Sequence, residues 1–287
     1  MQYPGNTPLL RYTLGDIGDN HIYIKDESQN PTGSIKDRAV FQMLIDAKEQ
    51  GKLVDHPTII EATSGNTGIS LGFYQKDFDY DAIIVMPTSV SLGRRRLIEK
   101  YGAKLVLVDG GMKECKEKAE ALLQEIPNSF LLDQFNNLSN PRAHYLHTAR
   151  EIQLDCPPIT HVFVGIGTGG TITGIGKFFE KRVVDVIGIE PKESPLLTQG
   201  VAGPHLIQGL GANFIPSILD RELIKDIVDV AGEDAIKMAR YLNKHGFHNG
   251  ISSGAAMAGC LSYLKENDIH KAVAVVVFPD SEDRYEW

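Results

Sequence analysis

One lysine stands in a local setting that suits covalent amine chemistry. Lys36 lies in the segment Asn30–Arg38, where Asn-Pro and Gly indicate a turn and Ser34 with Asp37 resembles a capping box that opens a helix. The positive end of a helix dipole disfavours an ammonium ion, and burial lowers the pKa of a lysine, so both would free the amine for Schiff-base formation. From this segment alone, an ordinary exposed lysine is the commoner outcome. Lys25 is nearby, but it ends an expected strand and lacks the turn.

A second polar segment could bind a small anion. Glu61–Gly68 follows an apolar run and supplies hydroxyls, an amide and glycines before a helical pattern. These groups offer several hydrogen-bond donors to one carboxylate at a helix start. The alternative is a Ser/Thr/Gly connection that ends in an ordinary N-cap.

A third segment, Gly165–Thr171, could hold a phosphate. Its glycines leave backbone N–H groups open at an expected helix start. The segment also satisfies GxGxxG, and Glu190 ends the next apolar run about 20 residues on, so a dinucleotide-binding enzyme stays open at this point. The hydroxyls of Thr168 and Thr171 suit a terminal phosphate better than a bridging pyrophosphate.

A fourth segment, Gly250–Ala256, places serine hydroxyls at another expected helix start. Such a hydroxyl could hydrogen-bond a ring nitrogen or cap the helix. The nine histidines form no HxxxH or HExxH pattern, so no catalytic metal is predicted. His144 and His147, three residues apart on an expected helix, are interpreted as structural.

Short β-rich runs alternate with helical patterns and must position these four motifs. The expected strands are Ile22–Lys25, Thr58–Glu61, Ala82–Met86, Lys104–Val108, Phe130–Leu132, His161–Val164, Val183–Ile189 and Ala272–Phe278. Helical spacing covers Arg38–Gln50, Gly93–Tyr101, Met112–Glu125, Pro141–Leu154, Asp234–Lys244 and Ala255–Asn267. This alternation predicts an α/β fold of βαβ units with parallel sheets covered on both faces. Each motif is expected at a strand-to-helix transition, in a crevice at the carboxyl ends of the strands.

Composition limits the class of protein. A chain of 287 residues predicts one large or two packed domains, and 42% hydrophobic with 23% charged residues is ordinary for a globular protein. The net charge of −8 argues against nucleic acid or an anionic membrane as the main partner. Three scattered cysteines indicate reduced thiols. Without a signal segment or a long apolar run, we expect a soluble, cytoplasmic protein.

Taken together and in this order, the four motifs resemble those of fold type II pyridoxal-phosphate enzymes, specifically the cysteine synthase (O-acetylserine sulfhydrylase) family. The resemblance runs from Gly5–Leu9 to Asp283–Tyr285. It also includes Met86-Pro87, Arg95-Arg96, Tyr101-Gly102-Ala103, Asp133-Gln134-Phe135-Asn136-Asn137 and Gln208-Gly209-Leu210-Gly211. Glu282 departs from the family pattern, which has glycine at that position. The family sequences also continue beyond the motif, whereas here Glu286-Trp287 are the last residues.

The resemblance implies a fold like that of the tryptophan synthase β-subunit. Two open, mostly parallel twisted sheets would be flanked by helices, with the active site in the cleft between two domains. Residues 1–35 and 140–287 would form the larger, cofactor-phosphate-binding domain. Residues 36–139 would form the smaller, mobile domain that binds the substrate carboxylate.

The same resemblance assigns roles to individual residues. Lys36 would form the internal aldimine with pyridoxal 5′-phosphate and move the substrate α-proton. The other cofactor contacts would be Asn66 at the 3′-oxygen, Gly167, Thr168, Gly169, Gly170 and Thr171 at the 5′-phosphate, and Ser252 at the pyridine nitrogen. The substrate α-carboxylate would be held by Thr63, Ser64, Thr67 and Gln134.

The implied reaction is a β-replacement that makes L-cysteine from O-acetyl-L-serine, or a similar activated serine, and sulfide through an α-aminoacrylate. A neutral hydroxyl at Ser252 does not hold the ring nitrogen protonated, which favours β-elimination over racemisation. The stretches Ile60–Ile69 and Leu132–Tyr145 most resemble the B-type isozyme. Gly203-Pro204-His205 and Gln208–Pro216 resemble the A-type instead, which favours sulfide over thiosulfate as the sulfur donor. The open alternatives are a cystathionine β-synthase-like enzyme, a cysteine-degrading and sulfide-releasing β-lyase, an NAD-binding oxidoreductase and an inactive binding module. The resemblance also suggests a homodimer.

Overall fold

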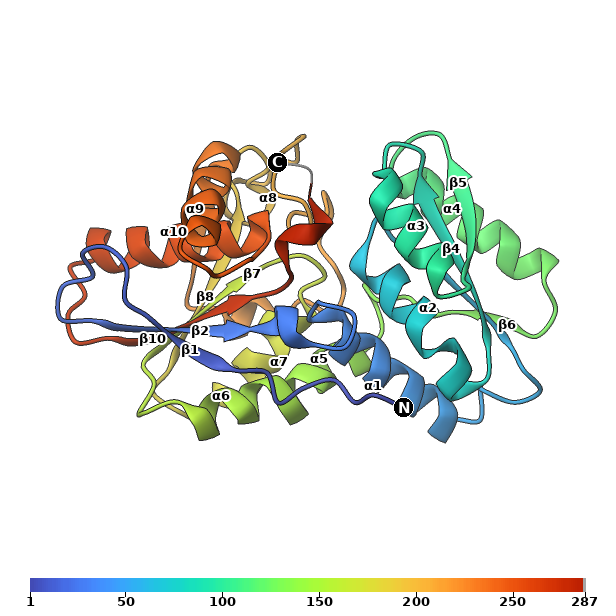
Figure 1. Ribbon diagram of the computed structural model, residues 1–287, viewed down its shortest axis with the longest axis horizontal. Helices are drawn as coiled ribbons and strands as arrows, with labels where there is room; N and C mark the ends of the chain where they lie inside the picture. The colour runs from blue at the N-terminus through green and yellow to red at the C-terminus, as the bar shows by residue number, and fades with distance from the viewer. Residues whose placement is uncertain (286–287) are drawn as a thin grey trace. The chain divides into compact units, whose positions relative to one another are not determined.

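The computed structural model describes residues 1–285 and divides them into two compact units (Figure 1). The first unit comprises Met1–Pro4 and Lys36–Asn140. The second comprises Gly5–Ile35 and the described chain from Pro141 onward. None of the helices within these 285 residues has both the length and the apolar character that crossing a bilayer requires.

The first unit is built on a four-stranded sheet in the order β5-β4-β3-β6, with every pair parallel. Its strands are β3 (Thr58–Ala62), β4 (Asp81–Pro87), β5 (Lys104–Val108) and β6 (Ser129–Leu131). Its helices are α1 (Lys36–Glu49), α2 (Asn66–Phe78), α3 (Leu92–Lys100) and α4 (Met112–Glu125). Alternate side chains of a strand point to opposite faces. In β4, Ile84 therefore packs with α1, α2 and α3, whereas Ile83 and Val85 pack with α4.

The second unit is built on a six-stranded sheet in the order β1-β2-β10-β7-β8-β9, in which β1 and β2 are antiparallel and the other pairs are parallel. Its strands are β1 (Leu9–Tyr12), β2 (His21–Asp26), β7 (His161–Gly165), β8 (Asp185–Pro191), β9 (Asp226–Val230) and β10 (Val273–Phe278). The larger helices are α6 (Ala149–Asp155), α7 (Gly170–Phe179), α9 (Gly232–Lys244) and α10 (Ile251–Glu266). Helices α9 and α10 cover one face, and α6 and α7 cover the other (Figure 1).

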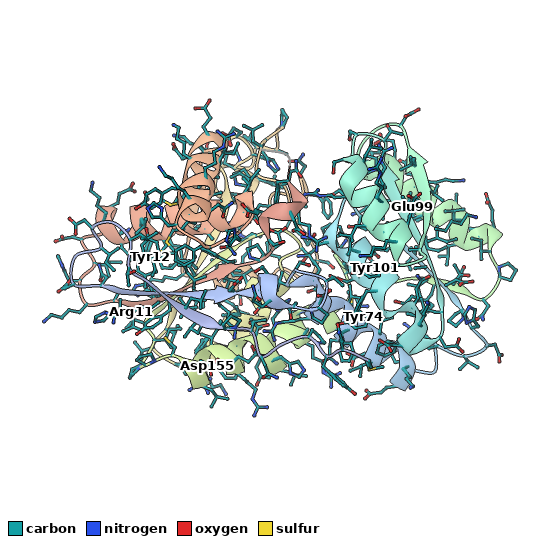
Figure 2. All side chains as sticks on the ribbon, in the orientation of Figure 1. Arg11, Tyr12, Tyr74, Glu99, Tyr101 and Asp155 are labelled. Carbon is teal, nitrogen blue, oxygen red and sulfur yellow. The ribbon has the colours of Figure 1, made fainter. Side chains whose placement is uncertain are left out.

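Short elements complete the chain. They are the helices α5 (Ser139–Ala143) and α8 (Leu196–Gln199), a π-helical turn (His144–Thr148) and the 3-10 turns Glu27–Gln29, Arg221–Leu223 and Glu282–Arg284. Buried aromatic side chains contribute to both cores: Tyr74 of α2 lies in the first unit and Tyr12 of β1 in the second (Figure 2).

The expected α/β architecture with two open, mostly parallel sheets is confirmed. Every expected strand is present, with small shifts at the ends. The strands β1 and β9 were not expected, and both lie at edges of the six-stranded sheet, where polar side chains interrupt the apolar run. The expectation that all four motifs follow strands is wrong for Gly250–Ala256, because α9 precedes that segment.

Candidate functional site

Lys36 is the first residue of α1 and is partly buried. The start of this helix is tied to the start of α2. Ser70 Oγ lies 2.5 Å from Asp37 Oδ1 and 3.1 Å from the carbonyl oxygen of Asn66. Ser34, the expected capping partner, forms a β-bridge with Asp280. Within the first unit, the helix that carries Lys36 is therefore fixed beside the helix that begins at Asn66.

The expected carboxylate loop joins β3 to α2. Thr63 and Thr67 are buried, Ser64 is exposed and Asn66 is partly buried. The Gly65 N–H donates to Thr63 Oγ1 at 3.3 Å, which closes a tight turn. The first N–H groups of a helix have no intrahelical partner, so this turn opens onto a start that suits an anion.

Gln134 belongs to the same polar cluster. Thr67 Oγ1 donates to Gln134 Oε1 at 2.7 Å, although the two residues are 67 positions apart. Asn140 Nδ2 donates to the Gln134 carbonyl oxygen at 2.9 Å. The structure thus brings together Thr63, Thr67 and Gln134 of the four residues expected at the substrate carboxylate, with Ser64 on the adjoining turn.

The expected phosphate loop joins β7 to α7 in the second unit. Gly169 has φ +82°, which favours glycine, and a Cβ on Gly167 would lie 2.3 Å from the carbonyl oxygen of Gly209. Thr168 Oγ1 accepts from the Gly170 N–H at 3.3 Å. Because the glycines of this loop carry no side chains, its backbone N–H groups and the first turn of α7 can approach an anion closely.

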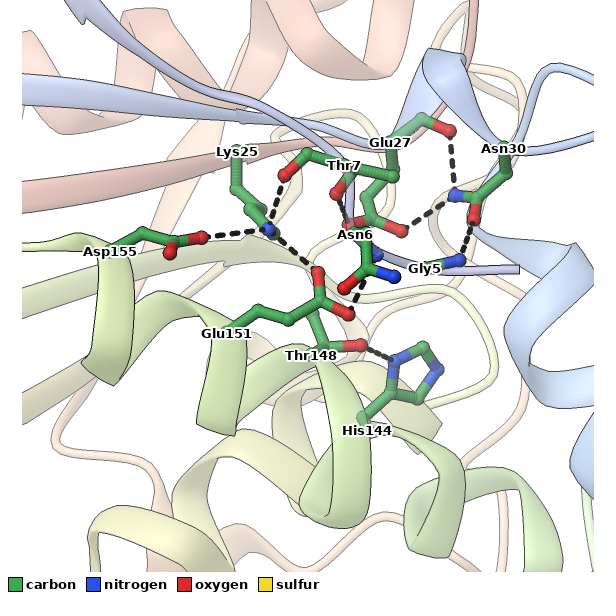
Figure 3. A network of polar contacts seen from close by, with 10 residues as sticks. All are labelled: Gly5, Asn6, Thr7, Lys25, Glu27, Asn30, His144, Thr148, Glu151 and Asp155. Atoms are coloured by element: carbon green, nitrogen blue, oxygen red, sulfur yellow. Dashed lines mark hydrogen bonds and ion pairs between the residues drawn. The ribbon is translucent and has the colours of Figure 1, made fainter. Parts of the chain in front are cut away.

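His144 has a structural contact with this loop that local sequence patterns do not reveal. Its Nε2 lies 3.3 Å from Thr171 Oγ1. Its Nδ1 lies 3.0 Å from Thr148 Oγ1, the contact drawn in Figure 3. It occupies a π-helical turn, a feature that is frequent near functional sites. Its distance of 27 positions from Thr171 hides the contact from any short motif.

Ser252 is the second residue of α10 and is 3% exposed. Its hydroxyl makes no hydrogen bond with any of residues 1–285, so it has both donor and acceptor capacity for a ligand. The preceding glycine is required by packing, since a Cβ on Gly250 would lie 2.3 Å from both Asp280 Oδ1 and Tyr285 Cε2.

Two charged side chains that the sequence analysis singled out, Glu190 and Lys25, already have hydrogen-bond or ion-pair partners within the second unit. Glu190 accepts from the backbone N–H groups of Leu197 at 3.0 Å and Thr198 at 2.8 Å, so this carboxylate is not open to a ribose. Lys25 is fully buried, and its Nζ lies 2.8 Å from Glu151 Oε2 and 2.6 Å from the Thr7 carbonyl oxygen (Figure 3). Lys25 is therefore a structural cation.

Two further observations limit the site. Within the described residues no group of three or more His, Cys, Asp or Glu side chains could hold a metal ion. Glu282, where the resembled motif has glycine, is hydrogen-bonded to His248 at the start of a 3-10 turn, with 2.7 Å between Oε1 and Nδ1. Glu286 and Trp287, the other departure from that motif, lie outside the described residues.

Comparisons with known proteins agree on one family. The family model described as "Pyridoxal-phosphate dependent enzyme" matches residues 1–280. The curated "Cysteine synthase B" of Campylobacter jejuni is 48% identical over 98% of this chain and 94% of its own length. Among solved structures, a hydrogen sulfide-producing enzyme from Fusobacterium nucleatum has a TM-score of 0.93 at 39% identity, covering 98% of this chain and 97% of that one. The cysteine synthase of Entamoeba histolytica has a TM-score of 0.92 at 34% identity, with 98% and 87% covered.

Proposed function

The chain belongs to the cysteine synthase family of pyridoxal-phosphate-dependent enzymes, and from this premise we propose that it makes L-cysteine and acetate from O-acetyl-L-serine and sulfide. It is an enzyme of the cysteine synthase type, and its cofactor is pyridoxal 5′-phosphate. The observation that carries the proposal is the 48% identity to a curated cysteine synthase over almost the whole of both chains.

The residues present fit this cofactor. The glycine-rich loop at the start of α7 suits a phosphate. The hydroxyl of Ser252, a residue that is 3% exposed, has no hydrogen-bond partner among residues 1–285 and suits an aromatic ring nitrogen. When bound, pyridoxal phosphate supplies an electron sink for the electron pair left on the substrate Cα. The residues proposed to hold it are Lys36, Asn66, Gly167, Thr168, Gly169, Gly170, Thr171 and Ser252.

Side chains of the protein itself would transfer the substrate proton and bind the substrate carboxylate. Lys36 Nζ takes the proton from the substrate Cα and returns it when the product forms. Thr63, Ser64, Thr67 and Gln134 bind the substrate α-carboxylate and orient the Cα–H bond toward that amine. Since Ser252 presents a neutral hydroxyl rather than a carboxylate, it leaves the ring nitrogen unprotonated, which favours loss of the β-acetoxy group over racemisation.

The assignment of work to the two parts of the chain is also a proposal. Residues 1–35 and 140–287 would bind the cofactor phosphate, and residues 36–139 would bind the substrate carboxylate. The motifs support it, because the glycine loop and Ser252 belong to the second unit and the Thr63–Thr67 loop belongs to the first. We further propose a cytoplasmic homodimer.

A second candidate function is release of sulfide from L-cysteine, which the same site chemistry would support. The hydrogen sulfide-producing enzyme of Fusobacterium nucleatum favours it, because this chain covers 97% of that protein at 39% identity. A cystathionine β-synthase-like use of homocysteine remains the third candidate.

The cofactor-loaded protein should be incubated with O-acetyl-L-serine and sulfide, and L-cysteine and acetate should appear in equal amounts. Parallel reactions with homocysteine as nucleophile, and with L-cysteine alone followed for sulfide, rank the alternatives. Lys36→Ala should keep the fold but lose turnover, whereas Lys48→Ala, an exposed lysine on the same helix, should not change it. Faster sulfide release than cysteine formation would overturn the proposal in favour of the second candidate.

A further inference from the structure

A carboxyl group is buried at the end of the strand that leads into the proposed carboxylate loop. Glu61 is the penultimate residue of β3 and is 3% exposed, and the loop begins two residues later at Thr63. Burying a carboxyl group is costly unless hydrogen-bond donors surround it. We therefore expect hydrogen-bond donors around Glu61, and their contacts with its carboxyl group fix their positions.

Three donors from one turn converge on Glu61. The Asp133 backbone N–H donates to Oε2 at 2.8 Å. The backbone N–H and side-chain amide of Gln134 face the same carboxyl group and lower its pKa. Burial raises the pKa of Glu61 to about 8, while these hydrogen bonds oppose the rise. The charges of Asp133 and of Lys116 on α4 also act on it.

The other end of the Gln134 amide is fixed as well. Its Oε1 accepts from Thr67 Oγ1 at 2.7 Å. A side-chain amide has one oxygen and one NH2 group, so an oxygen that faces Thr67 leaves the NH2 group to face Glu61. Thr67 donates to the oxygen end of the amide, and Glu61 lies on the side of its NH2 group. The two residues together therefore set which way the Gln134 amide points.

We propose that Glu61 is a positioning residue for substrate recognition, which orients the Gln134 amide so that its second N–H, with the N–H groups at the start of α2, meets the α-carboxylate of the amino-acid substrate. This inference rests on the proposed function for the role of Gln134 at that carboxylate. Glu61 acts through Gln134, and Thr67 holds the same amide from the other side.

The test separates recognition of the carboxylate from recognition of the amine. The cofactor-loaded protein is titrated with L-serine and with ethanolamine, which lacks the carboxylate, and binding is followed by the visible absorbance of the cofactor. Glu61→Gln keeps the size of the side chain but turns an NH2 group toward the donors of Gln134. The substitution should weaken the binding of L-serine about tenfold, which is the effect of losing one hydrogen bond to the charged carboxylate. The binding of ethanolamine should stay unchanged.

A double-mutant cycle distinguishes action through Gln134 from a general effect on the fold. Gln134→Ala alone should weaken the binding of L-serine. Adding Glu61→Gln to that variant should cause no further loss of affinity. Glu190→Gln is the matched control, because Glu190 is the penultimate residue of β8, equally buried, and binds the N–H groups of Leu197 and Thr198 instead. It should leave the preference for L-serine over ethanolamine unchanged.

Additive losses in the double mutant, or an equal loss for both ligands, would overturn the inference. If Glu61→Gln does not fold, Glu61→Asp replaces it: a selective loss of L-serine supports the inference, and an equal loss or no loss overturns it. Cysteine formation by the unchanged protein is measured separately. A selective effect on L-serine without cysteine formation would mean that the proposed reaction is wrong and the inference stands.

Discussion

Replacing Glu61 with Gln should remove a pH dependence from the stability of the protein. Burial raises the pKa of this carboxyl from its ordinary value of 4.5 to about 8. An acid with a raised pKa in the folded state binds more protons when folded than when unfolded between these two values. The stability that it contributes is therefore present below pH 4.5 and is lost as the pH rises toward 8. At about 1.36 kcal/mol per pKa unit, the loss amounts to about 5 kcal/mol.

The assay is urea unfolding followed by far-UV circular dichroism at several values between pH 5 and pH 9, for the unchanged protein and for Glu61→Gln. The other titrating groups are common to both proteins, so the difference between the two unfolding free energies isolates Glu61. Between pH 5 and pH 9 this difference should move by about 4 kcal/mol in favour of the variant, because a small part of the loss already occurs below pH 5. A difference that stays flat across the range would refute the reasoning, because it would mean that Glu61 titrates in the folded protein as it does in the unfolded chain.

Two further substitutions test the second unit. Lys25→Ala leaves Glu151 without its buried partner and should reduce the free energy of unfolding by roughly 3–5 kcal/mol in chemical denaturation. Adding Glu151→Ala to that variant should cause a smaller further loss. Gly167→Ala places a Cβ 2.3 Å from the carbonyl oxygen of Gly209 and should weaken cofactor binding at least about tenfold in a dialysis titration, whereas Gly93→Ala, which meets open space, should leave binding unchanged.

The central strands and the loops that follow them were predictable because their signals are local. The apolar run Thr58–Ala62 and the polar turn after it adjoin in the chain, as do β7 and its glycine loop. The edge strands β1 and β9 were not predicted, because each has a solvent-facing side and its polar residues break the apolar pattern. Their pairing depends on neighbours that are distant in the sequence, which no short window contains.

Contacts between side chains of the site were less predictable than the loops themselves. The Thr67–Gln134 hydrogen bond spans 67 positions, and Glu61 reaches the Asp133 N–H across 72. Both are possible because β3 and β6 are neighbours in the sheet, so the segments after these strands meet at one edge. Strand order therefore had to be known before either contact could be inferred.

A sequence signal for such positioning residues nevertheless exists. Glu61 and Glu190 each interrupt an apolar strand at its penultimate residue, and both are buried in the folded protein. A glutamate in the middle of a parallel strand would be surrounded by backbone groups already paired in the sheet. One residue before the carboxyl end, it can reach unpaired N–H groups of an adjacent segment, which is what both carboxyls do. A buried glutamate at this position therefore indicates a loop that must be held still, and only the identity of that loop separates a role in substrate recognition from one in the scaffold.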